Sequence, residues 1–169
     1  AEDPSACARV VITGSVSFST TNGPSPKTFE NHIFTILVTA KSPELGITIK
    51  LDYNHLGPTV YENLTLTKDA ASKDLTYFCA NGYPLTIGEN VTTVAKANGY
   101  NFCLTGGTKD TAYEGGSHLT VRSGAWRNVY VGNYKGAMTG AAVYEMSGGT
   151  IDNYIGVTYN GTHTGPLTM

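Results

Sequence analysis

The residues of this sequence that could bind a ligand are mainly aromatic, and they recur at regular spacing near the C-terminal end. When the two copies of a C-terminal repeat are aligned, Tyr130 matches Tyr154 and Tyr134 matches Tyr159. Trp126 lies beside them and has no aromatic counterpart in the second copy. Exposed aromatic rings can stack on sugars or anchor protein partners. We therefore expect each tyrosine pair to form a ladder on one face, with Trp126 as the first candidate for ligand contact. The alternative is that the tyrosines only cover the fold.

Residues suited to catalysis are sparser. Hydrolysis of a glycosidic bond needs two facing carboxyl groups, about 5 to 9.5 Å apart. Glu145 and Asp152 are the acidic candidates in the repeated region, and Glu145 is expected on a solvent face. Arg122, Arg127 and His118 could supply a base, but no acidic cluster lies beside them in the sequence. The sequence therefore predicts no catalytic residue.

The sequence also predicts no metal site and no cofactor. Asp110 and Glu114 lie close together in one loop, but they provide too few oxygen ligands for a calcium site. The four histidines are dispersed, and His163 falls where the preceding copy has Met138. The three cysteines are Cys7, Cys79 and Cys103, and no C-x-x-C spacing occurs. We expect them to be small buried hydrophobic residues, with one disulfide plus a free thiol as the alternative.

The composition excludes several classes of partner. Of the 169 residues only 14% are charged, the net charge is −2, and the 11 lysines and arginines are scattered. Nucleic acids and anionic membranes attract basic patches, so we expect neither as a partner. No apolar run approaches the roughly 20 residues of a spanning helix, so no membrane insertion is expected. The low charge and the abundance of Thr, Asn, Gly and Tyr favour an extracellular or cell-surface protein.

The elements that position these side chains are short strands. Alternation of apolar and polar residues predicts strands at 9–18, 32–39, 46–53, 60–67, 75–79, 84–88, 101–105, 118–122, 129–131, 142–146 and 153–157. Residues 69–74 could form one helical turn. The sharp turns between strands favour glycine, so we interpret four glycines as corners, namely Gly124, Gly132, Gly148 and Gly156.

A repeat indicates how the strands are arranged. Ser123-Gly124 and Ser147-Gly148 open two copies at an offset of 24, and the offset becomes 25 after Gly132. A shorter echo relates residues 80–83 to 97–100, and residues 85–87 to 102–104, at an offset of 17. Periods of this length in a β-type sequence are typical of a stacked coil of parallel strands. The sequence therefore predicts a parallel β-helix, also called a β-solenoid.

The chain divides into two parts on this interpretation. Residues 1–60 are expected to form an irregular N-terminal cap or the first irregular rungs, because open coil ends are usually protected by an atypical segment. The alternative is a small separate β-domain. Residues 61–169 are expected to form the regular rungs. The last residues resemble those before Ser147-Gly148, so the array is expected to continue beyond Met169.

Two segments resemble a known family. Residues 116–131 (GSHLTVRSGAWRNVYV) and 144–156 (YEMSGGTIDNYIG) resemble repeats in large bacterial surface proteins with right-handed parallel β-helix folds. Residues 77–92 (YFCANGYPLTIGENVT) look like the adjoining rungs, so the resemblance covers roughly residues 60–169. It implies an all-β, right-handed parallel β-helix of adhesin-like or pectin-lyase-like type. The triplets of pectin-cleaving hydrolases, Asn-Thr-Asp and Gly-His-Gly, and their Asp-Asp pair are absent.

Three functions remain open on the sequence alone. The favoured one is a non-catalytic module that contacts a glycan or a host or cell-surface protein through its aromatic face. The second is a polysaccharide lyase or glycosidase whose catalytic rungs lie partly outside this segment. The third is a structural stalk. The candidate ligand-binding residues are Trp126, Tyr130, Tyr134, Tyr154 and Tyr159.

Overall fold

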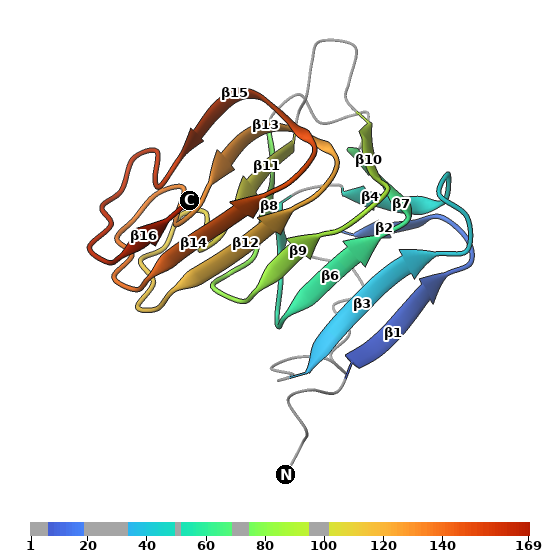
Figure 1. Cartoon of the computed structure of the whole chain (residues 1–169), viewed down its shortest axis with the longest axis horizontal. Helices are drawn as coiled ribbons and strands as arrows, with labels where there is room; N and C mark the ends of the chain where they lie inside the picture. The colour runs from blue at the N-terminus through green and yellow to red at the C-terminus, as the bar shows by residue number, and fades with distance from the viewer. Residues whose placement is uncertain (1–6, 19–33, 50–51, 69–74, 95–101) are drawn as a thin grey trace.

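The chain folds into a coil of parallel strands, as the sequence predicts. The computed structural model describes residues 7–18, 34–49, 52–68, 75–94 and 102–169. These residues form sixteen strands and no helix, wound into a β-solenoid of about five turns (Figure 1). The one helical turn expected at residues 69–74 lies outside the described residues.

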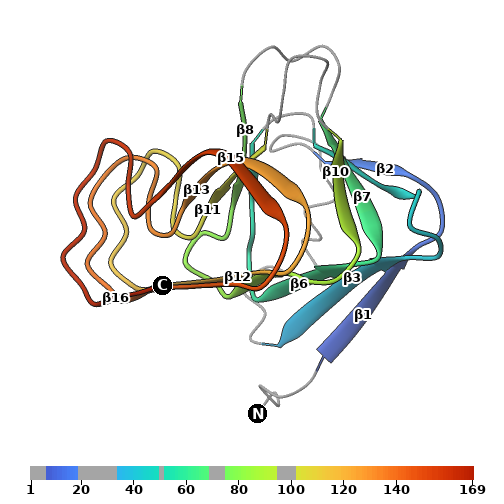
Figure 2. The ribbon, with the colours of Figure 1, turned by 45° about the horizontal axis from the view of Figure 1, so that its top comes forward.

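Three parallel sheets form the walls of the coil (Figure 2). Sheet A contains seven strands: β1 (Cys7–Ile12), β3 (Thr35–Ala40), β6 (Thr59–Glu62), β9 (Leu85–Ile87), β12 (Ser117–Val121), β14 (Ala142–Met146) and β16 (Leu167–Thr168). Sheet B contains four strands: β2 (Val16–Phe18), β4 (Gly46–Ile49), β7 (Leu64–Lys68) and β10 (Val91–Val94). Sheet C contains five strands: β5 (Tyr53–Asn54), β8 (Thr76–Cys79), β11 (Phe102–Thr105), β13 (Ala125–Tyr130) and β15 (Thr150–Gly156).

The core consists of apolar columns that run along the coil. In sheet C, Phe78 lies opposite Leu104, Leu104 opposite Val129, and Val129 opposite Ile155. The first three side chains are fully buried, whereas Ile155 in the last rung is 39% exposed. Each turn therefore buries its apolar residues against the next turn, which explains why a strand such as β9 can be very short.

The C-terminal repeat corresponds to successive turns of the coil, but its period at Ser123-Gly124 is 25 residues rather than 24. β12 pairs in parallel with β14, and Leu119 lies opposite Tyr144. Ser123-Gly124 therefore corresponds to Gly148-Gly149, and not to Ser147-Gly148. The φ angles agree, because Gly124 has φ 83° and Gly149 has φ 82°.

The other proposed corner glycines differ in role. Gly132 lies in the turn after β13 and Gly156 is the last residue of β15, and neither has a positive φ. Asparagine takes the left-handed conformation at two earlier corners, where Asn63 and Asn90 have φ values of 53° and 56°. Their side chains are joined across one turn by a hydrogen bond of 3.1 Å. The short Asn side chain tolerates this conformation, so it replaces glycine there.

The echo at an offset of 17 does not describe successive turns, and that interpretation was wrong. Residues 85–87 belong to sheet A, whereas residues 102–104 belong to sheet C. Leu85 lies opposite Leu119 in the next turn, and Thr76 lies opposite Phe102, so a full turn is much longer than the echo. The two segments resemble each other because both are short buried strands of the coil.

Residue 60 is not a boundary between sheets. Val60 of β6 lies opposite Leu37 of β3, and β3 in turn pairs with β1. Sheet A therefore runs without a break across this position (Figure 1). The described residues before position 60 add turns of unequal length to the same coil, since Cys7 lies opposite Thr35 and Ile36 lies opposite Thr59.

Candidate functional site

Trp126 is a core residue, and the expectation that it is exposed for ligand contact was wrong. Its side chain is 0% exposed, and its indole lies edge to face against Phe102 with ring centroids 6.3 Å apart. The indole Nε1 donates a hydrogen bond of 3.1 Å to the carbonyl of Ser123. Its partner in the next turn is Ile151, so it does have a neighbour in the stack.

The position of Trp126 explains its size. Sheet B ends at β10, and side-chain hydrogen bonds take the place of a backbone ladder there. Thr93 Oγ1 donates to the carbonyl of Ala125 and accepts from its amide. Ser123 Oγ accepts from the amide of Val91. The described turns beyond this point have strands in sheets A and C only. The indole fills the interior where the cross-section changes from three walls to two.

The tyrosines, in contrast, lie together on the outer side of sheet C. Tyr134 and Tyr159 are stacked, with ring centroids 5.2 Å apart and planes 10° apart. The Tyr130 ring lies 5.6 Å from Tyr154 and 5.0 Å from Tyr134. Tyr77, which the sequence did not single out, joins the group 4.6 Å from Tyr134. We name these five residues the tyrosine surface.

Two kinds of element hold the tyrosine surface. Tyr77, Tyr130 and Tyr154 lie in strands of sheet C, whereas Tyr134 and Tyr159 lie in the turns that follow β13 and β15. These turns stack on one another, as their orange and red colours show in Figure 2, and the amide of Tyr159 donates to the carbonyl of Tyr134 at 3.1 Å. The tyrosines therefore fill the angle between the sheet and the stacked turns.

Exposure rises towards the last turn. Tyr77 and Tyr130 are 5% and 3% exposed, whereas Tyr154 and Tyr159 are 40% and 63% exposed. Burial raises the pKa of Tyr77 and of Tyr130 above the usual value, so both hydroxyls stay neutral at ordinary pH. Within the tyrosine surface, only the rings of Tyr154 and Tyr159 present large areas to a ligand.

The register of one pair differs from the sequence alignment. Tyr154 lies opposite Asn128, and Tyr130 lies opposite Gly156, because the ladder shifts between Trp126 and Asn128. The rings of Tyr130 and Tyr154 still touch. Tyr134 and Tyr159 therefore stack as expected, whereas Tyr130 and Tyr154 touch without lying opposite each other, so the ladder expected for that pair was wrong in its register.

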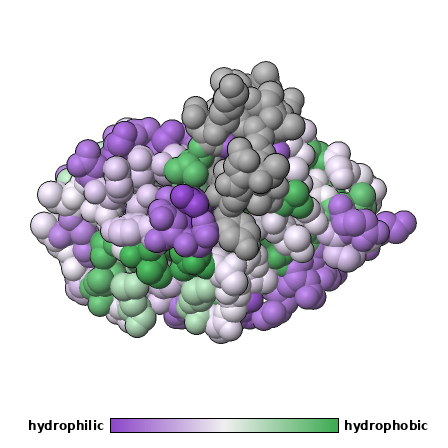
Figure 3. Space-filling model, turned by 90° about the horizontal axis from the view of Figure 1, so that it is seen from above, coloured by the Kyte–Doolittle hydropathy of each residue, from purple (hydrophilic) through white to green (hydrophobic). Residues whose placement is uncertain are grey.

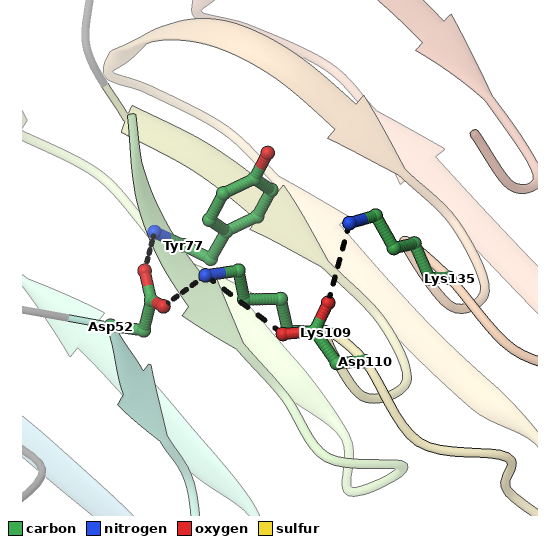
Figure 4. A network of polar contacts seen from close by, with 5 residues as sticks. All are labelled: Asp52, Tyr77, Lys109, Asp110 and Lys135. Carbon is green, nitrogen blue, oxygen red and sulfur yellow. Dashed lines mark hydrogen bonds and ion pairs between the residues drawn. The ribbon is translucent and has the colours of Figure 1, made fainter. Parts of the chain in front are cut away.

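A polar hollow adjoins the tyrosine surface. It has a volume of about 370 Å³ and is lined by Asp52, Asn54, Asn81, Thr108, Lys109, Asp110 and Thr111. Lys109 connects the two regions, because its Nζ lies 2.5 Å from Asp52 Oδ2 and 4.7 Å from the centre of the Tyr77 ring (Figure 4). Asp52 Oδ1 also accepts a hydrogen bond of 2.9 Å from the Tyr77 amide.

The charges at the hollow are paired. Asp110 lies between two lysines, with carboxylate oxygens 3.9 Å from Lys109 Nζ and 3.8 Å from Lys135 Nζ (Figure 4). Partial burial acts to lower the pKa of Lys109, but the hydrogen bond and the charge of Asp52 outweigh it and raise the pKa overall. Lys109 is therefore a cation held between two carboxylates. No sequence pattern indicated this group, since Asp52 and Lys109 are 57 residues apart.

The acidic and basic candidates of the repeated region form separate exposed pairs. His118 Nε2 lies 3.4 Å from Glu145 Oε1 on the outer side of sheet A, where the Glu145 side chain is 62% exposed as expected. Arg127 pairs with Asp152 on sheet C. Glu145 and Asp152 therefore do not face each other. Within the described residues, no three His, Cys, Asp or Glu side chains are placed to hold a metal ion.

Two of the three cysteines contribute to packing. Cys79 and Cys103 are 0% exposed, lie beneath the tyrosines and have free thiols. Burial raises the pKa of Cys79 to about 12 and that of Cys103 to about 11, so neither is a reactive thiolate. Cys7 is also free but exposed, in contrast to its expected burial.

Asn133 fixes the turns that carry the hollow. Its side chain is 0% exposed; Oδ1 accepts from the Thr108 amide at 2.8 Å, and Nδ2 donates to the carbonyls of Thr111 and Ala137 at 3.0 Å each. We expect Asn133→Ala to lower the free energy of unfolding by about 2 kcal/mol, because it leaves a buried amide without its acceptor. Urea unfolding measures this. The exposed Asn160→Ala is the control, and an equally small effect of both changes would contradict the assignment.

Comparison with known proteins finds no match: no family model, no curated protein and no solved structure matches this chain. In the part of the chain that the structure describes, no helix has the length and apolar character needed to cross a membrane. The function must therefore be inferred from the geometry of the chain itself.

Proposed function

We propose that this chain is a non-catalytic β-solenoid module that binds carbohydrate on the tyrosine surface and in the adjoining polar hollow. One observation carries the proposal: Lys109 joins the cluster of aromatic rings to a hollow lined by carboxylates, amides and hydroxyls. Sugars present both apolar C–H faces and hydroxyl groups, so a binding site needs both kinds of protein group. A hollow of about 370 Å³ lies within the size range of small-molecule sites.

The face of the molecule that is seen from above has a mixed character. Figure 3 shows hydrophilic and hydrophobic residues side by side on this face. A broad apolar face would favour a protein partner instead. The mixed face supports a carbohydrate in preference to a second protein, which is the other partner that the aromatic residues first suggested.

Stacking on a sugar requires a ring with an accessible face, and the packing selects Tyr159. The Tyr134 ring contacts Tyr77, Tyr130 and Tyr159, and Lys135 Nζ lies 5.3 Å from its centre. Tyr159 is stacked on Tyr134 by one face and is 63% exposed. We therefore assign the main stacking contact to Tyr159, and a second contact to Tyr154, the other exposed ring of the tyrosine surface.

The first binding test changes Tyr159. We expect Tyr159→Ala to weaken binding of an oligosaccharide about fivefold, because an aromatic stacking contact contributes on the order of 1 kcal/mol. Binding to a panel of plant and host glycans, followed by calorimetry, measures the change. Tyr159→Phe is the matched control, since it keeps the ring and removes only the hydroxyl. Equal affinities for all three proteins would remove Tyr159 from the site, and a chain that binds no glycan would contradict the proposed function.

The low charge and the Thr-, Asn-, Gly- and Tyr-rich composition support an extracellular or cell-surface location for this module. The resemblance of residues 116–131 and 144–156 to bacterial surface repeats points the same way. A stiff coil that carries its binding groups on one wall would present them at a distance from the cell, as an adhesin does.

A further inference from the structure

We propose that the polar hollow selects neutral sugar units and rejects sugars that carry a carboxylate or a sulfate. This inference rests on the proposed carbohydrate binding and adds the class of sugar. Three observations support the inference. The charged groups that the structure describes at the hollow are paired, Asp110 is exposed and can accept hydroxyl groups, and amide side chains complete the lining.

The charge of the described lining is balanced within itself. Asp52 and Asp110 supply two negative charges, and Lys109 and the adjacent Lys135 supply two positive charges, all within ion-pair distance of a partner. Acidic sugars are recognised by cations that are available to them, most effectively by arginine. Lys109, the lysine of the lining, is shared by two carboxylates. An incoming anion would therefore compete with Asp52 and be repelled by Asp110.

Asp110 is well placed to accept hydroxyl groups. Its side chain is 56% exposed. Its carboxylate oxygens lie 3.8 Å from Lys135 Nζ and 3.9 Å from Lys109 Nζ, and both distances exceed a hydrogen-bond length. An ionised carboxylate has about four lone-pair positions that accept hydrogen bonds. A sugar diol can donate two hydroxyl protons to such a group, whereas an ionised carboxylate on a sugar cannot donate at all.

The rest of the lining suits a neutral ligand. Asn54 and Asn81 carry amides that can both donate and accept, and Thr111 carries a hydroxyl that can do the same. Asn81 is held in a left-handed conformation with φ 57°, and its Nδ2 donates to the carbonyl of His55 at 3.4 Å. The orientation of the Asn81 amide is therefore set by the fold, as expected for a site that binds sugar hydroxyl groups at defined positions.

A matched pair of ligands tests the inference. The first is the neutral oligosaccharide that binds best in the glycan panel, and the second is the same oligosaccharide with its C6 alcohols oxidised to carboxylates. We expect the oxidised form to bind at least tenfold more weakly at low salt, with the gap narrowing as salt screens the repulsion. Equal or tighter binding of the oxidised form would overturn the inference while leaving carbohydrate binding intact. Binding of no oligosaccharide would overturn both proposals.

A variant of the hollow gives the second arm. Asp110→Asn keeps the shape of the side chain and removes the carboxylate that Lys109 and Lys135 share, so that Lys109 keeps its ion pair with Asp52. We expect its preference for the neutral form to fall at least threefold relative to the unchanged protein. The control is Asp152→Asn, which removes a charge that pairs with Arg127 outside the hollow. An unchanged preference in a folded Asp110→Asn protein would contradict the role of Asp110.

Discussion

Replacement of Trp126 by alanine should lower the free energy of unfolding by about 4 kcal/mol, the range typical of a buried aromatic residue. The whole side chain is inside the coil, and it closes the interior where sheet B ends. The neighbouring turns are held by their own ladders on both sides, so they cannot collapse to fill the space. Urea unfolding followed by circular dichroism measures the loss, because the variant removes the one tryptophan of the chain as a fluorescence probe.

The comparison with Trp126→Phe separates packing from ligand contact. Phenylalanine refills most of the volume and should restore a large part of the stability. Carbohydrate affinity at a temperature where both variants are folded should match that of the unchanged protein. A stable Trp126→Ala protein with weakened sugar binding would contradict the assignment of Trp126 to the core.

The second large effect is a loss of stability in acid that depends on His55. This residue is 2% exposed; its Nδ1 donates to the carbonyl of Cys79 at 2.7 Å, and its Nε2 accepts from the Tyr61 hydroxyl at 2.9 Å. Its ring is also enclosed by Tyr53 and Phe78, with centroids 5.0 and 4.6 Å away. Burial lowers the pKa of His55 from 6.5 to about 4, although the bond to Cys79 acts in the opposite direction.

The direction of the change in stability with pH depends on which state, folded or unfolded, binds the proton at His55. Between pH 6.5 and about pH 4 the unfolded chain takes up a proton at His55 and the folded chain does not. The free energy of unfolding should therefore fall as the pH falls through this window, by up to about 3 kcal/mol from this one group.

A matched variant isolates this contribution from that of the carboxylates. His55→Gln cannot titrate, so the stability difference between the unchanged protein and the variant should shrink by about 3 kcal/mol between pH 7.5 and pH 4. Urea midpoints measured at several pH values provide this difference. The exposed His118→Gln should leave most of the slope in place. A constant difference between the unchanged protein and His55→Gln across the window would show that His55 is not buried in its neutral form.

The architecture could be predicted from the sequence because every turn must bury the apolar residues of its strands against the next turn. Alternation and a period near 25 are enough to indicate parallel stacked strands, and the parallel pairing of β12 with β14 confirms this. Strand β10 was missed, and β13 was placed only at residues 129–131. The apolar Trp126 followed by the charged Arg127 was the available sequence signal for the longer β13 strand, in which Trp126 is buried and Arg127 half-buried.

The candidate site could be predicted only in part. The tyrosine ladder follows from the period, so Tyr134 and Tyr159 were found as a pair. Trp126 was misassigned because alignment by residue type gave it no stacking partner, whereas the ladder places it opposite Ile151. No local sequence pattern indicated the polar hollow, because its residues come from distant parts of the chain. Asp52 and Lys109 meet only because different turns of the coil bring them to the same wall.

The most direct test of carbohydrate binding on the tyrosine surface is a titration of the isotope-labelled chain with neutral oligosaccharides, followed by two-dimensional NMR. We expect saturable shifts at Tyr154 and Tyr159 and at Asp110 and Thr111 in the hollow, with sheet B unaffected. Shifts confined to sheet B or to the outer side of sheet A would place the binding surface elsewhere. Shifts with acidic sugars alone would overturn the preference for neutral sugars, and the absence of any saturable shift across a broad panel of neutral and acidic sugars would contradict the proposed function itself.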